Sequence, residues 1–192
     1  MDFEQIKKHI SDLMDEERFI HSLGVMELSE KLAIIYGIDS EKAKTAGLIH
    51  DAAKQMPEEK MLSLLEKAYE GREKDKIVFK NKGLWHGPAG FVYVKETFGV
   101  DEETANAVFY HTIGKEKMTL LEKIVFLADC IEVNRDNEFD WAKDLRKLAE
   151  TDLDSAIVSA VDQSLKSIIK RNLIIHPGSV NLRNEILETK AL

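Results

Sequence analysis

Residues 47–54 read Gly-Leu-Ile-His-Asp-Ala-Ala-Lys, so a histidine and an aspartate directly follow a short apolar run. Asp39 or Ser40 can cap the helix that leads into this stretch. An ionised carboxylate among apolar residues is costly unless it is paired or bound to a metal ion. Neighbouring side chains on a helix point about 100° apart. His50 and Asp51 can therefore hold one ion only at the flank of their helix, with other helices supplying the remaining ligands.

Four more residues have settings of this kind. His21 lies inside a predicted helix, His86 at a helix start and His111 near a helix end, while Asp129 closes the apolar run 124–129. A single histidine on an apolar face is more often a hydrogen-bonded core residue than a ligand. Four such histidines with two aspartates are harder to assign to the core. Spacing alone leaves a metal site and a polar core both open.

The rest of the chain carries helical periodicity almost throughout. Thr119 and Glu122 have the spacing of a capping box, Pro57 suits the first turn of a helix, and residues 72–83 predict a loop or a short helix. No strand, hairpin dipeptide or repeat is evident. The pattern predicts an all-α fold, one helical bundle of about eight to ten helices. We expect a single domain over 1–192, with a core at about 18–135 and C-terminal helices at 141–190 packed on it.

Bulk composition narrows the function classes. The net charge of −8 disfavours duplex nucleic acid, because such binding depends on Lys and Arg neutralising phosphates. Cys130 is the one cysteine, which suits a reducing cytosol. The acidic N-terminus does not read as a signal peptide, and no stretch has the roughly 18 apolar residues of a membrane helix. We expect a cytoplasmic protein without nucleic-acid or membrane partners, as a monomer or homodimer.

The ordered histidines and aspartates lie in segments that resemble the HD phosphohydrolase superfamily, in its variant with two extra histidines and two metals. The resemblance covers roughly residues 18–184 and points to the branch of symmetrical bis(5'-nucleosyl)-tetraphosphatases. Val133 stands where that branch suggests proline, and Ile113 where a second threonine is usual, but neither position offers a metal ligand. The matching segments are 18–25 (Arg-Phe-Ile-His-Ser-Leu-Gly-Val), 47–54, 86–88 (His-Gly-Pro), 110–112 (Tyr-His-Thr), 127–132 (Leu-Ala-Asp-Cys-Ile-Glu) and 134–135 (Asn-Arg).

The resemblance implies a centre of two metal ions. The first ion would be bound by His21, His50, Asp51 and Asp129. The second would be bound by His86 and His111, with Asp51 bridging. Imidazole and carboxylate ligands suit iron, manganese, cobalt, nickel or zinc, and the family implies iron. Such an ion pair can hold a hydroxide that attacks phosphorus, with Asp51, Lys54 and Asp129 as catalytic residues.

The same resemblance, with helical spacing, yields candidate substrate contacts. Lys54 follows His50 by one turn and Arg18 precedes His21 by three residues, so both are expected to face the ions; a surface Lys–Asp pair is the alternative for Lys54. Glu132, one turn after Asp129, is either a hydrogen-bond partner of a ligating histidine or an ordinary surface residue. Trp85 and Tyr110 could stack on a base, although core packing is the commoner role. The complete set of expected substrate contacts is Arg18, Lys54, Glu132, Arg135, His176, Arg183 and Asn184, with Asn181 in the same C-terminal polar cluster as the last three; a helix-capping loop is the alternative for that cluster.

The implied activity is hydrolysis of diadenosine tetraphosphate into two ADP. The residues themselves argue only for metal-assisted hydrolysis of a phosphoester or phosphoanhydride. Two alternatives remain: the same site acting on another nucleotide, such as a guanosine alarmone, a nucleoside phosphate or a cyclic dinucleotide, and a nucleotide-binding sensor without turnover. The intact ligand set and Lys54 speak against the sensor.

Overall fold

The computed structural model describes residues 1–71, 73–137 and 139–190, and this part of the chain is helical without a strand. It holds eleven α-helices, one more than the upper end of the expected range, because the five-residue α5 counts among them. Two 3₁₀ turns, Lys82–Leu84 and Val133–Asn137, join them. The helices are α1 (Phe3–Leu13), α2 (Glu16–Tyr36), α3 (Ser40–Ile49), α4 (Glu58–Ala68), α5 (Lys76–Lys80), α6 (His86–Phe98), α7 (Glu102–Tyr110), α8 (Leu120–Ile131), α9 (Ala142–Ala149), α10 (Leu153–Lys170) and α11 (Pro177–Lys190).

Side-chain caps set most helix starts. The Asp39 carboxylate accepts the backbone N–H of Lys42 and so begins α3, which decides between the two caps expected there. Thr119 and Glu122 form the capping box of α8. Each cap satisfies a backbone donor that the first helical turn would leave unpaired.

The helix α3 ends earlier than the His-Asp pattern suggests. It stops at Ile49, and residues 50–56 continue as successive turns. In these turns Ala52 N–H donates to Ile49 O at 3.0 Å and Lys54 N–H to Asp51 O at 2.9 Å. Bonds between residues three apart wind the chain more tightly than an α-helix. His50 and Asp51 therefore project from the end of α3 rather than from its flank.

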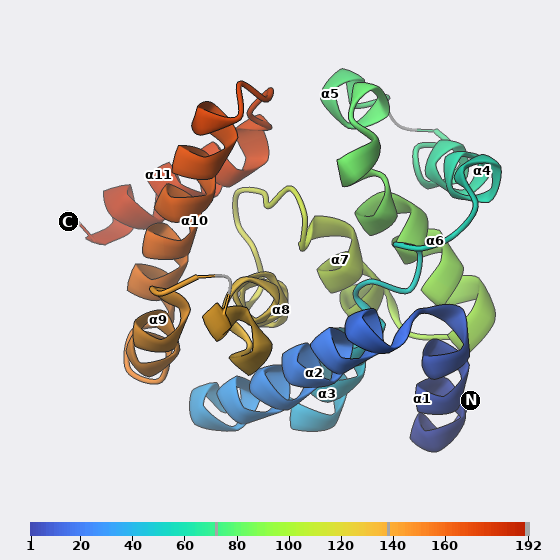
Figure 1. The fold of residues 1–192 in the computed structure, drawn as a ribbon, viewed down its shortest axis with the longest axis horizontal. Helices are drawn as coiled ribbons and strands as arrows, with labels where there is room; N and C mark the ends of the chain where they lie inside the picture. The colour runs from blue at the N-terminus through green and yellow to red at the C-terminus, as the bar shows by residue number, and fades with distance from the viewer. Residues whose placement is uncertain (72, 138, 191–192) are drawn as a thin grey trace.

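Two apolar cores flank the centre of the molecule. One is built mainly on α2, α8, α9, α10 and α11, the other mainly on α1, α4, α6 and α7. Helix α3 contributes to both, and it packs on α2, α7 and α8. In Figure 1, α8 lies near the middle, with α9 to α11 on one side and α4 to α7 on the other. The C-terminal ends of α3 and α7 and the N-terminal end of α6 thus come together between the two cores.

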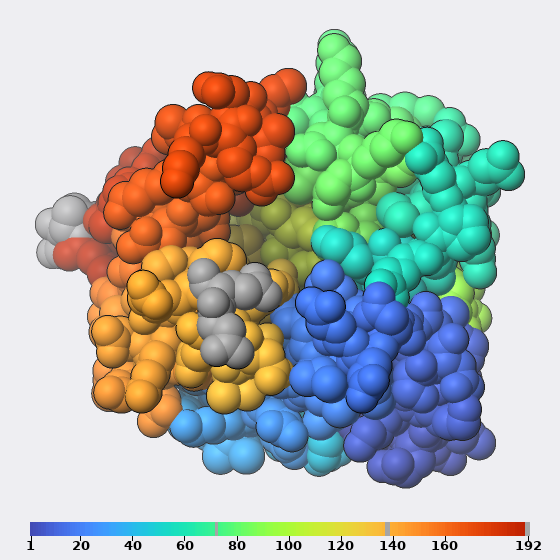
Figure 2. Space-filling model, viewed as in Figure 1, coloured from blue at the N-terminus to red at the C-terminus, as the bar shows by residue number. Residues whose placement is uncertain are grey.

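The surface is hollowed between the C-terminal helices and the segment that contains α5 and the start of α6 (Figure 2). Leu84, Thr112, Ile168 and Ser179 line a cavity from both sides. Within the described ranges, no helix is both long and apolar enough to cross a bilayer.

Candidate metal centre

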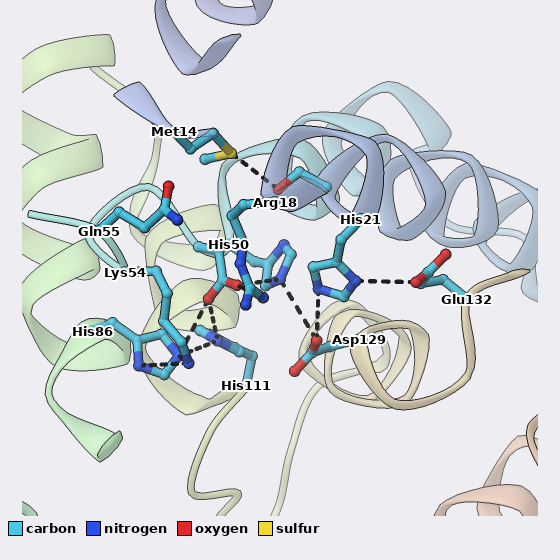
Figure 3. Close-up of polar contacts among 12 residues, drawn as sticks. Met14, Arg18, His21, His50, Lys54, Gln55, His86, His111, Asp129 and Glu132 are labelled. Atoms are coloured by element: carbon cyan, nitrogen blue, oxygen red, sulfur yellow. Dashed lines mark hydrogen bonds and ion pairs between the residues drawn. The ribbon is translucent and has the colours of Figure 1, made fainter. Parts of the chain in front are cut away.

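Five helices bring the four histidines and two aspartates to one point (Figure 3). All four histidines and Asp51 are buried, each with 7% or less of its surface exposed. The positions are α2 for His21, the end of α3 for His50 and Asp51, the first residue of α6 for His86, the residue after α7 for His111, and α8 for Asp129.

Three of the imidazoles are oriented by a hydrogen bond from Nδ1. His50 Nδ1–H donates to the carbonyl of Gly47 at 2.7 Å, and His111 Nδ1–H donates to that of Val108 at 2.7 Å. His21 Nδ1–H donates to the Glu132 carboxylate at 3.1 Å. Each bond leaves Nε2 as the atom that faces the centre. Partners of this kind fix the ring and tautomer of metal-ligating histidines.

Glu132 reaches His21 because Gly24 has no side chain. A Cβ at Gly24 would lie 2.1 Å from the Glu132 carboxylate oxygen. Glu132 is buried, and its carboxylate also accepts the backbone N–H of Asn134 at 2.7 Å. It therefore orients the His21 ring, as in the first of the two roles weighed for it. Glu132 also lines a cavity of about 410 Å³ with Arg18 and His21, and its role as a substrate contact stays a prediction.

The candidate ligand atoms fall into two overlapping sets. In the first, His21 Nε2 lies 3.0 Å and His50 Nε2 3.7 Å from Asp129 Oδ1. In the second, Asp51 Oδ1 lies 3.2 Å from His86 Nε2 and 3.6 Å from His111 Nε2. Asp51 Oδ2 turns to the first set and lies 3.5 Å from His50 Nε2. The carboxylate of Asp51 thus spans the two sets.

These contacts fit metal ions. His21 Nε2 and His50 Nε2 are buried, and among the described residues neither has a hydrogen-bond partner. With Nδ1–H donated to Glu132, a neutral His21 would direct a lone pair at the Asp129 carboxylate 3.0 Å away, which is repulsive unless a proton or a cation intervenes. Ligand atoms bound to one ion at about 2.1 Å stand about 3.0 to 3.4 Å apart, close to the shorter separations here. Groups of this composition can hold a divalent ion.

The electrostatics keep both carboxylates ionised. Burial alone would raise the pKa of Asp51, but the imidazoles of His50, His111 and His86 hold it well below its usual range. Burial likewise opposes ionisation of Asp129, whose pKa is nevertheless held well below its usual range, first by the His21 imidazole beside it. Burial lowers the pKa of His86. Carboxylates that stay charged and a neutral imidazole are the forms that bind metal.

Three cationic side chains surround the cluster. Arg18 donates to Asp51 Oδ2 at 2.9 Å. Lys54 Nζ lies 3.1 Å from His86 Nε2. Arg135 donates to Asp129 Oδ1 and to the Asp129 carbonyl, each at 3.2 Å. Arg18, Lys54 and Arg135 are thus beside the cluster, as expected for groups that contact an anionic substrate.

A cavity of about 290 Å³ opens from the cluster and is lined by Lys54, His86, His111 and Asp129. Asp129 also lines a second cavity of about 350 Å³, which is walled by Phe139, Trp141 and Gln163, among others. None of these three residues stood among the candidates, because an aromatic pair and a lone glutamine on a helical pattern look like ordinary packing. Trp85, which did stand among them, is buried and donates its indole N–H to the Val78 carbonyl at 2.9 Å.

The C-terminal candidates lie apart from the cluster. His176 pairs with Asp75 at 2.8 Å, on the wall between the large cleft beside α5 and a smaller pocket that adjoins the central cavity. Arg183 is held by Asp162 of α10, and Asn184 accepts from Arg183 at 3.4 Å. The structure therefore does not bring Arg183 or Asn184 to the cluster, and their role as substrate contacts stays a prediction that their surroundings do not support.

Comparison with known proteins agrees with this geometry. Residues 18–134, which include all six candidate ligands, match the family described as HD domain. The chain belongs to the HD domain family. Proteins that resemble it over nearly the whole length include two named "Bis(5'-nucleosyl)-tetraphosphatase, symmetrical". The protein of Halalkalibacterium halodurans is 38% identical, with 95% of this chain and 93% of that protein covered. The protein of Bacillus subtilis is 38% identical, with 93% and 94% covered.

A solved HD domain structure shares the fold. The protein of Clostridium acetobutylicum, described as a "predicted HD superfamily hydrolase involved in NAD metabolism", superimposes with a TM-score of 0.91. It is 37% identical, and the match covers 98% of each chain. The all-helical architecture expected from the sequence is confirmed.

Proposed function

We propose that this HD domain protein hydrolyses diadenosine tetraphosphate symmetrically into two ADP. The observation that carries the proposal is the cluster of four buried histidines and two carboxylates, with Arg18, Lys54 and Arg135 beside it. The proteins named symmetrical bis(5'-nucleosyl)-tetraphosphatase that match along the whole chain support the choice of substrate.

We assign the metal ligands from the two sets of facing atoms. His21, His50, Asp51 and Asp129 would hold one ion, and His86 and His111 would hold the other, with Asp51 shared. Iron is the proposed metal; manganese, cobalt, nickel and zinc suit the same ligand types. When bound, such ions supply Lewis-acid activation of water and of phosphoryl oxygens.

The chain's own groups position the tetraphosphate. Lys54 stands at the cavity beside His86 and places a positive charge where a phosphoryl oxygen gains negative charge in the transition state. Arg135 has a forked guanidinium, a geometry suited to phosphate, and it lines the adjoining cavity beside Asp129. Arg18, from the opposite side, holds the carboxylate of Asp51. Water adds to one central phosphorus, the central P–O–P bond breaks, and both products leave as ADP.

The test is a product assay on the metal-loaded protein with a panel of dinucleoside polyphosphates. We expect diadenosine tetraphosphate to yield ADP alone. A mixture of AMP and ATP would refute symmetrical cleavage. Binding of the dinucleotide, seen as a raised melting temperature, without any product would instead identify a nucleotide sensor.

A further inference from the structure

Two further cavities share lining residues with the cavity at the cluster, and we call them its two branches. One branch runs past Asp129, Cys130, Ser164 and Ile168, which line both the central cavity and the space beside Trp141. The other runs past Leu84, Thr112 and Ser179 toward Ile174. The branches have volumes of about 350 and 230 Å³. A central cavity with two arms suits a ligand whose charged middle carries a group at each end.

The larger branch has an aromatic wall. Phe139 and Trp141 are stacked, with ring centroids 4.9 Å apart and planes inclined by 21°. Both side chains are only partly buried and rest on the core that underlies α8 and α9. The smaller branch has aliphatic walls at Leu84, Leu173 and Ile174, with His176 as its aromatic side chain. A flat heterocyclic ring gains most by stacking in the larger branch, because aromatic faces bind bases of every kind.

Polar groups face the aromatic wall from α10. Gln163, Ser164 and Ser167 line the branch, and in the described part of the chain no side-chain hydrogen bond is recorded for any of them. Gln163 and Ser164 are half-buried. An amide at such a position has both a donor and an acceptor to offer. Adenine presents the complementary pair on one edge, and glutamine reads adenine in this way elsewhere.

We infer that the branch walled by Phe139, Trp141 and Gln163 binds one purine base of the substrate, with the aromatic pair as the stacking surface and the Gln163 amide as the group that reads the base edge. This inference rests on the proposed function and adds to it the residues that set base preference. Asp129 lines the branch as well as the cluster, so the base would enter the branch while its phosphates stay beside the proposed metal ligands.

Steady-state kinetics test the role of Gln163. Gln163→Ala should raise KM for diadenosine tetraphosphate about tenfold with little change in kcat, since a lost hydrogen bond to a bound base weakens binding rather than chemistry. Gln163→Glu should shift preference toward diguanosine tetraphosphate, because a carboxylate only accepts hydrogen bonds and guanine offers two N–H donors, N1–H and N2–H, on its Watson–Crick edge, where adenine offers only N6–H beside the acceptor N1. Lys166→Ala, on an exposed face of the same helix, is the matched control and should leave both constants unchanged.

A binding measurement tests the aromatic wall without turnover. Trp85 and Trp141 are the two tryptophans of the chain, so Trp85→Phe leaves Trp141 as the only indole. In that background ADP should quench the fluorescence saturably, and CDP should do so more weakly. Gln163→Ala should shift the ADP midpoint upward about tenfold. Replacing Trp141 by leucine in the otherwise unchanged protein should weaken ADP binding, measured by calorimetry, by about 10- to 100-fold.

The two proposals fail separately. If the wild type hydrolyses no dinucleoside polyphosphate, the proposed function is wrong, whereas a saturable and Gln163-dependent quench by ADP still supports the base site. If the wild type produces ADP but the Gln163 variants keep its KM and base preference, the base site is wrong. An ADP midpoint that is the same in Gln163→Ala and Lys166→Ala also overturns it.

Discussion

Asp51 is the residue on which the two ligand sets depend. One of its oxygens lies near His86 and His111, and the other lies near His50. Asp51→Ala should therefore empty both metal positions. Metal analysis by mass spectrometry checks the result, and full occupancy in the variant contradicts the bridging role. His111→Ala, by comparison, should lose mainly one of the two ions.

Lys54 can be tested apart from metal binding. Lys54→Met keeps much of the aliphatic stem, so metal content and folding should survive. The rate of hydrolysis should fall by about 10²-fold, the low end for losing one group that stabilises charge in the transition state. Lys80→Met, an exposed lysine on α5, is the control. Equal rates in the two variants would return Lys54 to the role of a surface charge.

At the scale of single residues, the sequence predicted those site residues whose charged or polar side chains are costly to bury in apolar surroundings. Buried histidines and carboxylates stand out because apolar surroundings penalise them, and the structure gathers all six. Phe139, Trp141 and Gln163 carry no such signal, since their types are common on packed helices. For Arg183 the local signal is incomplete: a guanidinium in a polar run looks like an anion site, but the fold pairs it with Asp162 on α10, which the local sequence does not reveal.

Among the helices, start positions were predictable and end positions were not. Caps such as Asp39 and Thr119 act within three or four residues, so a local pattern reveals them. The end of α3 at Ile49 depends on tertiary contacts instead. His50 donates Nδ1–H back to Gly47 and directs Nε2 to groups from α2 and α8. Local spacing does not encode those partners.

The contact between the start of α10 and the end of α11 yields a pH-dependent prediction. The Lys190 ammonium, helped by Ser155, lowers the pKa of Asp152 to about 2. An unfolded chain has an ordinary aspartate pKa of about 3.9. The stabilisation is therefore complete above about pH 4 and is lost as the pH falls toward 2. Asp152→Asn should unfold more easily than the wild type at pH 7 and should lose less stability on acidification, measured by urea unfolding at pH 7 and pH 3.

Asparagine still serves as the N-cap of α10, so the comparison isolates the ion pair with Lys190. High salt should shrink the difference, because Asp152 is 42% exposed and exposed pairs are screened. Glu188→Gln on α11 is the control for the loss of one negative charge. If the wild type and Asp152→Asn respond identically to acid, the pair contributes nothing to stability.

For the whole molecule, the ligand cluster joins the two apolar cores. His21 and Asp129 lie on α2 and α8, which build one core, whereas His86 at the start of α6 and His111 after α7 are held by helices of the other core. Bound metal should stabilise the native state by about 3 kcal/mol at a hundredfold excess over the dissociation constant. A chelator should therefore lower the melting temperature, while the helical circular dichroism signal persists at about 20 °C. Asp51→Ala should melt at the same temperature with and without the chelator.

His21 and Glu132 are 111 positions apart in the chain, yet they share a hydrogen bond at the floor of the site. A growing polypeptide leaves the ribosome from its N-terminus at about 5–20 residues per second. His21 is therefore exposed for several seconds before α8 emerges with Asp129. During this interval the proposed ligand set lacks a carboxylate, and the His21 ring lacks the acceptor that orients it. We therefore expect metal to bind only after most of the chain has been synthesised.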